Sequence, residues 1–234
     1  MIDRSKFHVV PGTGHIFETA GKCSPDGSFR EAVYSREIAT GVRDTLITMG
    51  INAVIDYEPL KGKPEWLSKR QDIQQSRELR WRVNFVNAMC DKWGVENVIY
   101  LPIHVDAAAG KGWSTAGGWT AYTTRGTTKS DFLSECLYDA AERHLAGYAA
   151  SMRLKQKQGF YDIKQKPFRM DKTDGDRDKE ANYYVLANTK CPAVLTENLF
   201  QNNKCDVEFL LSEAGKRAII NLHVEGVLNY IKSL

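Results

Sequence analysis

Short apolar runs alternate along the chain with longer segments of helical periodicity. Apolar, β-branched runs predict strands at five places, namely residues 7–10, 51–56, 98–105, 118–124 and 193–197. Apolar positions at helical spacing predict helices over residues 30–49, 73–93, 130 into the 150s, and 212–232. This alternation predicts an α/β fold, a twisted, mostly parallel sheet with helices on both faces, in a single domain that spans residues 1–234.

Composition narrows the class of protein. The chain has 234 residues, of which 42% are hydrophobic and 26% charged, with a net charge of +3, so a disordered chain is excluded. No run approaches the roughly 20 apolar residues of a membrane helix, so we expect no membrane insertion. Basic residues form no long run, so we expect no nucleic-acid partner. The five cysteines lack a CxxC spacing and indicate neither a zinc knuckle nor a disulfide framework.

A charged segment at about 155–182 differs from the rest of the chain. It holds few aliphatic residues and includes a run of alternating acidic and basic residues at 171–180. The alternating aspartates resemble a calcium loop, but the glutamate that should follow the glycine is wrongly spaced, and we reject calcium on that ground. We expect an insertion-like, solvated loop.

Two histidines lie where strands of the predicted sheet end. His15 follows the first strand, and His104 closes the apolar run at 98–105. In α/β sheets ligands gather at this edge, and two histidines joined by carboxylates favour a metal site. A single histidine there would more often be structural. The remaining histidines lie inside predicted helices or strands, and we interpret them as structural: His8, His144 and His223.

Two carboxylates are placed to join these histidines. Glu31 opens the first long helix, where it can stabilise the helix dipole or turn toward a metal. Glu197 ends an apolar strand, where it either turns toward water or is buried at a cost of several kcal/mol. A catalytic zinc takes three protein ligands and leaves one position open, so two histidines and two carboxylates leave one carboxylate to carry a proton. The sequence therefore predicts a zinc hydrolase, without the HExxH or GxSxG motifs of other hydrolases.

Five ordered blocks together resemble one known family. The first two are Gly14-His15 with the loop at 19–27, and Arg30-Glu31-Ala32 with the helix at 36–39. The next two are similar to LxxRxxxAN, at 79–87, and to SIHxDA, at 103–108. The last block, at 192–202, is similar to PAVLVExGFxSN. This set resembles the zinc-dependent N-acetylmuramoyl-L-alanine amidases of the amidase-3 type, which include phage endolysins and bacterial enzymes.

The resemblance implies a role for each candidate residue. His15, Glu31 and His104 would hold one Zn²⁺ per chain, and Glu197 would be the catalytic carboxylate. The implied reaction is hydrolysis of the amide between the lactyl group of N-acetylmuramic acid and L-alanine of the stem peptide, in peptidoglycan or a muropeptide. The resemblance assigns no substrate-binding residues.

Departures from the family pattern lie beside these residues. Ile16 replaces the glycine after the first histidine, Pro102-Ile103 replaces the serine block before the second, and Asn198-Leu199 replaces the residues that follow the last glutamate. None removes a ligand, but they put the shape of the substrate groove in doubt. We predict that the charged segment between His104 and Glu197 borders that groove and tunes substrate choice.

Two other functions stay open at this point. One is a zinc peptidase that cuts within the stem peptide or cross-link, and the other is a non-catalytic wall-binding module. We expect a monomer. Because the N-terminus lacks the pattern of a secretory signal, we expect a protein that is cytoplasmic at synthesis and acts at the cell wall or periplasm after release or export. A phage lysin and a bacterial remodelling enzyme both fit.

Overall fold

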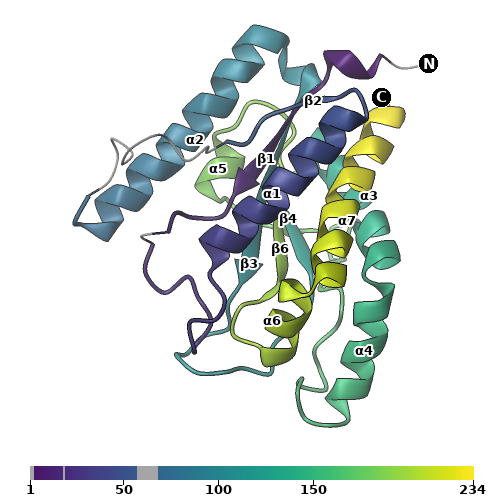
Figure 1. The fold of residues 1–234 in the computed structure, drawn as a ribbon. Helices are drawn as coiled ribbons and strands as arrows, with labels where there is room; N and C mark the ends of the chain where they lie inside the picture. Colours follow the sequence, from purple (N-terminus) through teal and green to yellow (C-terminus); the bar gives the residue numbers. More distant parts are fainter. Residues whose placement is uncertain (1–2, 18, 57–67) are drawn as a thin grey trace.

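One six-stranded sheet organises the computed structural model, which describes residues 3–17, 19–56 and 68–234 (Figure 1). The strand order is β2-β1-β3-β6-β4-β5. Their bounds are β1 His8–Thr13, β2 Asn52–Ala53, β3 Val98–Asp106, β4 Thr120–Thr123, β5 Lys179–Glu180 and β6 Leu195–Phe200. Strands β2, β1, β3 and β6 are parallel, whereas β4 runs antiparallel to β6 and β5 runs parallel to β4. The predicted α/β fold with a mostly parallel sheet is confirmed.

Helices cover both faces of this sheet, as predicted. On one face lie α1, α3 and α7, and on the other lie α2 and the short α5 (Figure 1). The helices are α1 Glu31–Thr48, α2 Gln71–Trp93, α3 Lys129–His144, α4 Ala146–Gln156, α5 Tyr184–Ala187, α6 Lys204–Leu211 and α7 Glu213–Lys232. Single 3-10 turns precede β1 and β3, at Arg4–Lys6 and Val95–Asn97. Among the described residues no helix has the length and apolar character needed to cross a membrane.

The alternation of side chains along the strands builds two cores. Val9 packs toward α1 and α7, whereas its neighbour Val10 packs toward α2. In β3, Leu101 joins the first, larger core and Tyr100 joins the second. Because successive residues of a strand point to opposite faces, an apolar run such as 98–105 fits a strand buried on both sides. This explains why the sequence pattern located these strands.

Four features differ from the sequence-based expectation. The helix predicted from residue 130 into the 150s is two helices that meet at Leu145, whose side chain is buried. The strand predicted at 51–56 is reduced to the two residues of β2, and α6 was not predicted. The charged segment is not a solvated loop throughout, because Asp178 is only 1% exposed and accepts a 2.6 Å hydrogen bond from the Thr123 hydroxyl.

A chain of buried hydrogen bonds ties β6 to α7. The indole nitrogen of Trp119 donates to Asn198 Oδ1 (2.9 Å), and Asn198 Nδ2 donates to Thr196 Oγ1 (3.0 Å). Thr196 Oγ1 lies 2.8 Å from His223 Nε2, and His223 Nδ1 lies 2.7 Å from the Ile219 carbonyl oxygen. This pattern assigns a neutral His223 that donates through Nδ1 and accepts through Nε2. His223 is therefore structural, in agreement with the sequence analysis.

The buried hydrogen bonds of His223 predict how the stability of the fold depends on pH. Burial lowers the pKa of His223 from 6.5 to about 4, so the unfolded state binds the proton more tightly than the folded state. The associated stability is complete above pH 6.5 and is lost as the pH falls toward 4, which amounts to about 3 kcal/mol for this shift in pKa. Denaturant unfolding across this pH range measures the free energy of unfolding of the wild type and of His223→Gln. The free energy should change less steeply with pH in the variant. Equal slopes would contradict the assignment.

Candidate active site

The carboxyl ends of β1, β3 and β6 meet at one edge of the sheet and carry the predicted site. His15 comes two residues after β1, and Glu31 is the first residue of α1. The register pairs His104 of β3 directly with Glu197 of β6. Since paired residues of neighbouring strands point to the same face and the strands lie roughly 5 Å apart, these two side chains are neighbours. All four candidate residues therefore lie at this edge.

The carboxylate of Glu31 lies between the two imidazoles. Its Oε1 is 3.0 Å from His104 Nδ1, and its Oε2 is 3.8 Å from His15 Nε2. The two rings are perpendicular, with centroids 5.1 Å apart. One donor atom from each of the three residues lies within 4.8 Å of the others. The backbone N–H of Val105 also donates to Glu31 Oε1 (3.1 Å), which orients the carboxylate.

Burial sets the charge state of these groups. Glu31 is 1% exposed, and its Oε2 has no hydrogen-bond partner among the described residues. Burial alone would raise the pKa of Glu31, but the hydrogen bond and the electrostatic interaction with His104 lower it. Burial lowers the pKa of His15 to about 3, so its imidazole is neutral near pH 7. A neutral imidazole and an ionised carboxylate are the forms that bind metal ions.

The loop that carries His15 has an unusual backbone. His15 has φ = 57°, in the left-handed region that is costly for residues other than glycine. The Ser35 hydroxyl of α1 accepts from the N–H of Gly14 and lies 3.1 Å from its carbonyl oxygen. A Cβ at Gly14 would lie about 3 Å from Glu31 Oε1 and His104 Nδ1, so only glycine lets the loop approach the site this closely.

A buried ionic network lies directly beneath this loop. Arg82 of α2 donates to Asp56 Oδ2 (2.6 Å), to Glu78 Oε1 (2.8 Å) and to the His15 carbonyl oxygen (3.1 Å). Asp56 also accepts from the backbone N–H of Thr13 (2.9 Å). Both carboxylates are at most 3% exposed. The network thus connects α2 and the end of β1 to the backbone of His15, and the sequence analysis assigned a role to none of its members.

Glu197 is half-buried and has a carboxylate oxygen, Oε2, that is fully buried without a hydrogen-bond partner among the described residues. Burial raises its pKa well above the usual range, and the negative charges of Glu31 and Asp106 raise it further. Arg169 opposes this effect on the pKa. An acid of this kind retains its proton readily, which suits a group that must both accept and release one.

Part of the charged segment lies beside Glu197. The guanidinium of Arg169 bonds Asp106 Oδ2 (2.8 Å) at the end of β3 and stacks 4.6 Å from the ring centre of Phe200. Tyr183, which follows the segment, packs edge-on against Tyr122, and the charge of Glu197 contributes to raising the pKa of Tyr183. One basic side chain of the charged segment, Arg169, therefore lies beside Glu197, together with Phe200 of β6 and Tyr183 just after the segment.

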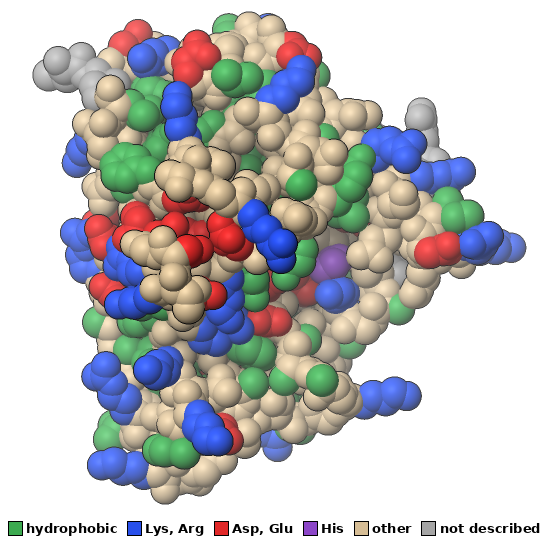
Figure 2. Space-filling view, turned by 180° about the vertical axis from the view of Figure 1, so that it is seen from behind, with side chains coloured by type: hydrophobic (Ala, Val, Ile, Leu, Met, Phe, Trp, Pro, Cys, Tyr) green, Lys and Arg blue, Asp and Glu red, His purple; other side chains and the backbone are tan. Residues whose placement is uncertain are grey.

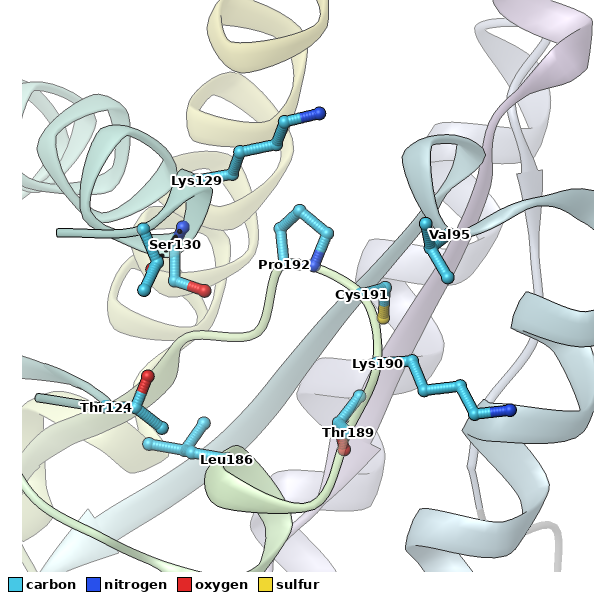
Figure 3. Close-up of a pocket in the computed structure, with 10 residues that line it drawn as sticks. Val95, Thr124, Lys129, Ser130, Leu186, Thr189, Lys190, Cys191 and Pro192 are labelled. Atoms are coloured by element: carbon cyan, nitrogen blue, oxygen red, sulfur yellow. Dashed lines mark hydrogen bonds between the residues drawn. The ribbon is translucent and has the colours of Figure 1, made fainter. Parts of the chain in front are cut away.

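Two cavities help to locate the site. A narrow cavity of about 30 Å³ is lined by His15, His104 and residues of the Arg82 network. A larger one, of about 330 Å³, lies at the opposite edge of the sheet around Cys191 and Pro192, and contains none of the four candidate residues (Figure 3). On the face opposite to the view of Figure 1, charged side chains gather in a dense mixed patch, and histidine surface is visible in a hollow beside it (Figure 2). Cavity size alone would misplace the site.

Comparison with protein families decides the identity. The family described as N-acetylmuramoyl-L-alanine amidase, Amidase_3, matches residues 9–229. The chain belongs to this amidase family. No curated protein sequence matches it. Members of Amidase_3 are zinc-dependent amide hydrolases that cut peptidoglycan, so the family and the amidase activity predicted from the sequence are confirmed, and the His-Glu-His group is consistent with a zinc site.

Solved structures share the fold across nearly the whole chain. The CwlD amidase of Clostridioides difficile, solved with the GerS lipoprotein, is 18% identical, with a TM-score of 0.71 over 97% of this chain and 100% of that one. The catalytic domain of CwlV from Bacillus (Paenibacillus) polymyxa var. colistinus is 16% identical, with a TM-score of 0.63 over 97% and 98% of the two chains. The catalytic domain of the CD27L endolysin, which targets Clostridia difficile, is 19% identical, with a TM-score of 0.56 over 95% and 97%.

One departure from the Amidase_3 motif, Asn198-Leu199, has a structural explanation. Leu199, at the glycine position of PAVLVExGFxSN, has φ = 66°, the left-handed conformation that glycine would adopt without strain. It lies at an irregularity in the pairing of β3 with β6, where two steps along β3 match three along β6. Asn198 donates to the His104 carbonyl oxygen (3.0 Å) and so links the strands of the two catalytic-edge residues.

The network under His15 predicts a stability effect. Arg82→Met removes the cation and leaves the Asp56 and Glu78 carboxylates buried without it, which costs about 3–5 kcal/mol for a buried pair broken on one side. Arg82→Lys keeps the positive charge but loses the bidentate geometry of the guanidinium. Its free energy of unfolding should therefore lie between those of the wild type and of Arg82→Met. Denaturant unfolding measures both effects, with the exposed Arg80→Met as control. An Arg82→Met variant as stable as the control would show that the network does not hold this loop.

Proposed function

We propose that His15, Glu31 and His104 hold one zinc ion per chain. Two imidazoles and one carboxylate are a donor set typical of catalytic zinc sites with an open position. Three observations support the assignment: the donor atoms converge within 4.8 Å, the pKa of His15 keeps that ring neutral, and Glu31 Oε2 is buried without a partner. A bound cation would satisfy this orphaned oxygen, and this is the observation on which the proposal chiefly depends.

Glu197 is the proposed proton carrier of the amidase reaction. Zinc bound here would polarise the scissile carbonyl and make water a better nucleophile near neutral pH. Glu197 lies beside His104 in the strand register, so its carboxylate is placed to accept the proton of the attacking water. Its raised pKa favours the protonated form after that transfer, and the same carboxyl then delivers the proton to the leaving nitrogen of L-alanine.

Two substitutions separate the metal role from the proton role. Glu197→Gln should retain zinc and lower kcat by about 10²–10⁴-fold, because the amide has the same shape but cannot carry the proton. His104→Ala should lose both zinc and activity, because one of three ligands is missing. Metal analysis of the purified proteins and the rate of muropeptide release measure the two effects.

A matched control comes from a histidine away from the site. His144 of α3 pairs with Glu225 of α7 at 2.6 Å, so His144→Ala should retain both zinc and turnover. A Glu197→Gln variant with near-normal turnover would rule out the proposed proton carrier, and a His104→Ala variant with full zinc content would rule out the ligand set. Mass spectrometry should find a free lactyl carboxyl group and a new L-alanine N-terminus; cuts inside the stem peptide would indicate a peptidase instead.

We further propose that the chain is one catalytic domain whose segment 155–182 tunes substrate choice. Its Arg169 is held beside Glu197 by the pair with Asp106, at the point where a stem peptide would pass. Stem peptides carry carboxylates, which a guanidinium binds well. From the sequence we retain the proposals of a monomer and of action at the cell wall or periplasm after release or export, which light scattering and cell fractionation test.

The role of Arg169 predicts a change in substrate preference. Arg169→Met should raise KM for muropeptides by about tenfold, as expected for the loss of one charge-assisted contact, with a smaller change in kcat. Steady-state kinetics on soluble muropeptides measures the two constants separately. Lys172→Met, at an exposed position of the same segment, is the control. Unchanged KM in both variants would show that the segment does not contact the stem peptide.

A further inference from the structure

Three carboxylates converge near the C-terminal end of the charged segment, away from the sheet edge that holds the proposed zinc site. Asp131 lies in the first turn of α3, and Asp176 and Asp178 precede β5. One oxygen from each lies within 4.8 Å of the others. Asp178 is anchored by Thr123 at the end of β4. Because β4 runs antiparallel to β6, this end of β4 lies at the opposite edge of the sheet from His104 and Glu197.

Asp131 and Asp178 are buried and Asp176 is half-buried, and their carboxylates are only partly satisfied. Asp178 is 1% exposed and Asp131 is 8% exposed. Asp178 Oδ1 and Asp176 Oδ1 are buried and have no hydrogen-bond partner among the described residues. Asp178 Oδ2 accepts from Thr123, and Asp131 accepts from the backbone N–H of Thr128 at the start of α3. Two acceptor oxygens are therefore left facing the cluster without a donor.

No basic side chain neutralises the cluster within the described part of the chain. Arg177, which lies between the two aspartates in sequence, turns away to pair with Glu135 (2.8 Å) and Asp139 (2.6 Å) of α3. The Lys129 side chain extends away from Ser130 and Pro192 at the neighbouring cavity (Figure 3). The three carboxylates therefore face one another without an ion pair among the described residues. Buried negative charge of this density requires protons or a cation.

A separate side chain also points into the cluster. Ser134 lies one turn after Asp131 on α3 and is completely buried. Its hydroxyl makes no hydrogen bond of acceptable geometry to any described residue, yet it lies close enough to Asp178 to lower the pKa of that carboxyl. This buried hydroxyl beside the Asp178 carboxyl adds a neutral oxygen to the three acidic groups.

We propose that Asp131, Asp176 and Asp178, together with the Ser134 hydroxyl, bind a Ca²⁺ ion. All the donors are oxygens, which hard divalent cations prefer, and no imidazole or thiolate is present to select zinc. The sequence comparison with calcium loops failed because it tested one continuous loop, whereas here a helix 45 positions before Asp176 supplies a ligand. Bound Ca²⁺ would fasten the end of the charged segment to α3, and the same segment carries Arg169 to the side of Glu197.

Equilibrium dialysis of the zinc-loaded protein against CaCl2 tests the site, with both metals counted by elemental analysis. Dialysis at about 5 mM CaCl2 should load one Ca²⁺ per chain in addition to zinc, since even the weaker protein sites for Ca²⁺ bind with Kd of about 10⁻⁴–10⁻³ M. Asp176→Asn should lose the Ca²⁺ and keep the zinc, and Ser134→Ala should bind Ca²⁺ more weakly. Ca²⁺ should raise the Tm of the wild type but not of Asp176→Asn.

Two matched variants make the result decisive. Asp174→Asn removes a charge from an exposed position of the same loop and should leave Ca²⁺ binding unchanged. His104→Ala, which should lose zinc, should still bind Ca²⁺, so failure of the zinc proposal and failure of this one give different results. The proposal is overturned if the wild type takes up no Ca²⁺ beyond the level of Asp176→Asn and its Tm is unaffected by CaCl2. Protons shared among the acids would then account for the cluster.

Discussion

The buried carboxylate of Glu31 is the group around which the catalytic edge is arranged. An ionised carboxylate 1% exposed is stable only where nearby groups compensate for lost water. Here the Val105 N–H and the imidazole of His104 contact Oε1, while Oε2 faces His15 and has no hydrogen-bond partner in the described part of the chain. The requirement extends to the backbone, because Gly14 has to lack a side chain for the loop to bring His15 this close. A single carboxylate thus fixes the relation between α1, β3 and the loop after β1.

Holding His15 in a left-handed conformation has a cost of order 1–3 kcal/mol, and the structure offsets it with a second buried charge system. Arg82 donates a hydrogen bond to the His15 carbonyl oxygen, and the carboxylates of Asp56 and Glu78 balance the positive charge of Arg82. Such networks contribute little net stability compared with apolar packing, but they define geometry because each donor has a fixed acceptor. The position of one proposed zinc ligand therefore depends on Glu78 and Arg82 of α2 and on Asp56 after β2, through a contact with the backbone of His15 and not with its imidazole.

The sequence located the strands, the long helices and the four candidate residues, because apolar periodicity marks buried elements and the family motifs mark the strand ends. It missed features that depend on contacts between distant segments. In the sequence nothing marks Asp56 and Glu78 as partners, and only the fold places both carboxylates against Arg82. Asp178 lies in a charged run of the sequence, but in the structure it is buried beside Thr123 of β4. The break between α3 and α4 at Leu145 was missed although Gly147 follows it by two residues, because a single glycine also occurs inside continuous helices. Register and long-range pairing are set by the fold as a whole, so a local pattern does not contain them.

The irregularity after Glu197 shows how the family site tolerates a changed sequence. A left-handed residue other than glycine costs roughly 1–2 kcal/mol, yet Leu199 is fully buried in the larger core, and burying a leucine side chain contributes about 1.5–3 kcal/mol. The two terms are of similar size, so leucine at a glycine position is compatible with a stable strand. Meanwhile Asn198 joins Trp119, Thr196 and the His104 carbonyl oxygen in one hydrogen-bonded group behind the catalytic edge. Asn198 and Leu199 thus support β3 and β6 from behind, and the four candidate residues remain at the edge of the sheet.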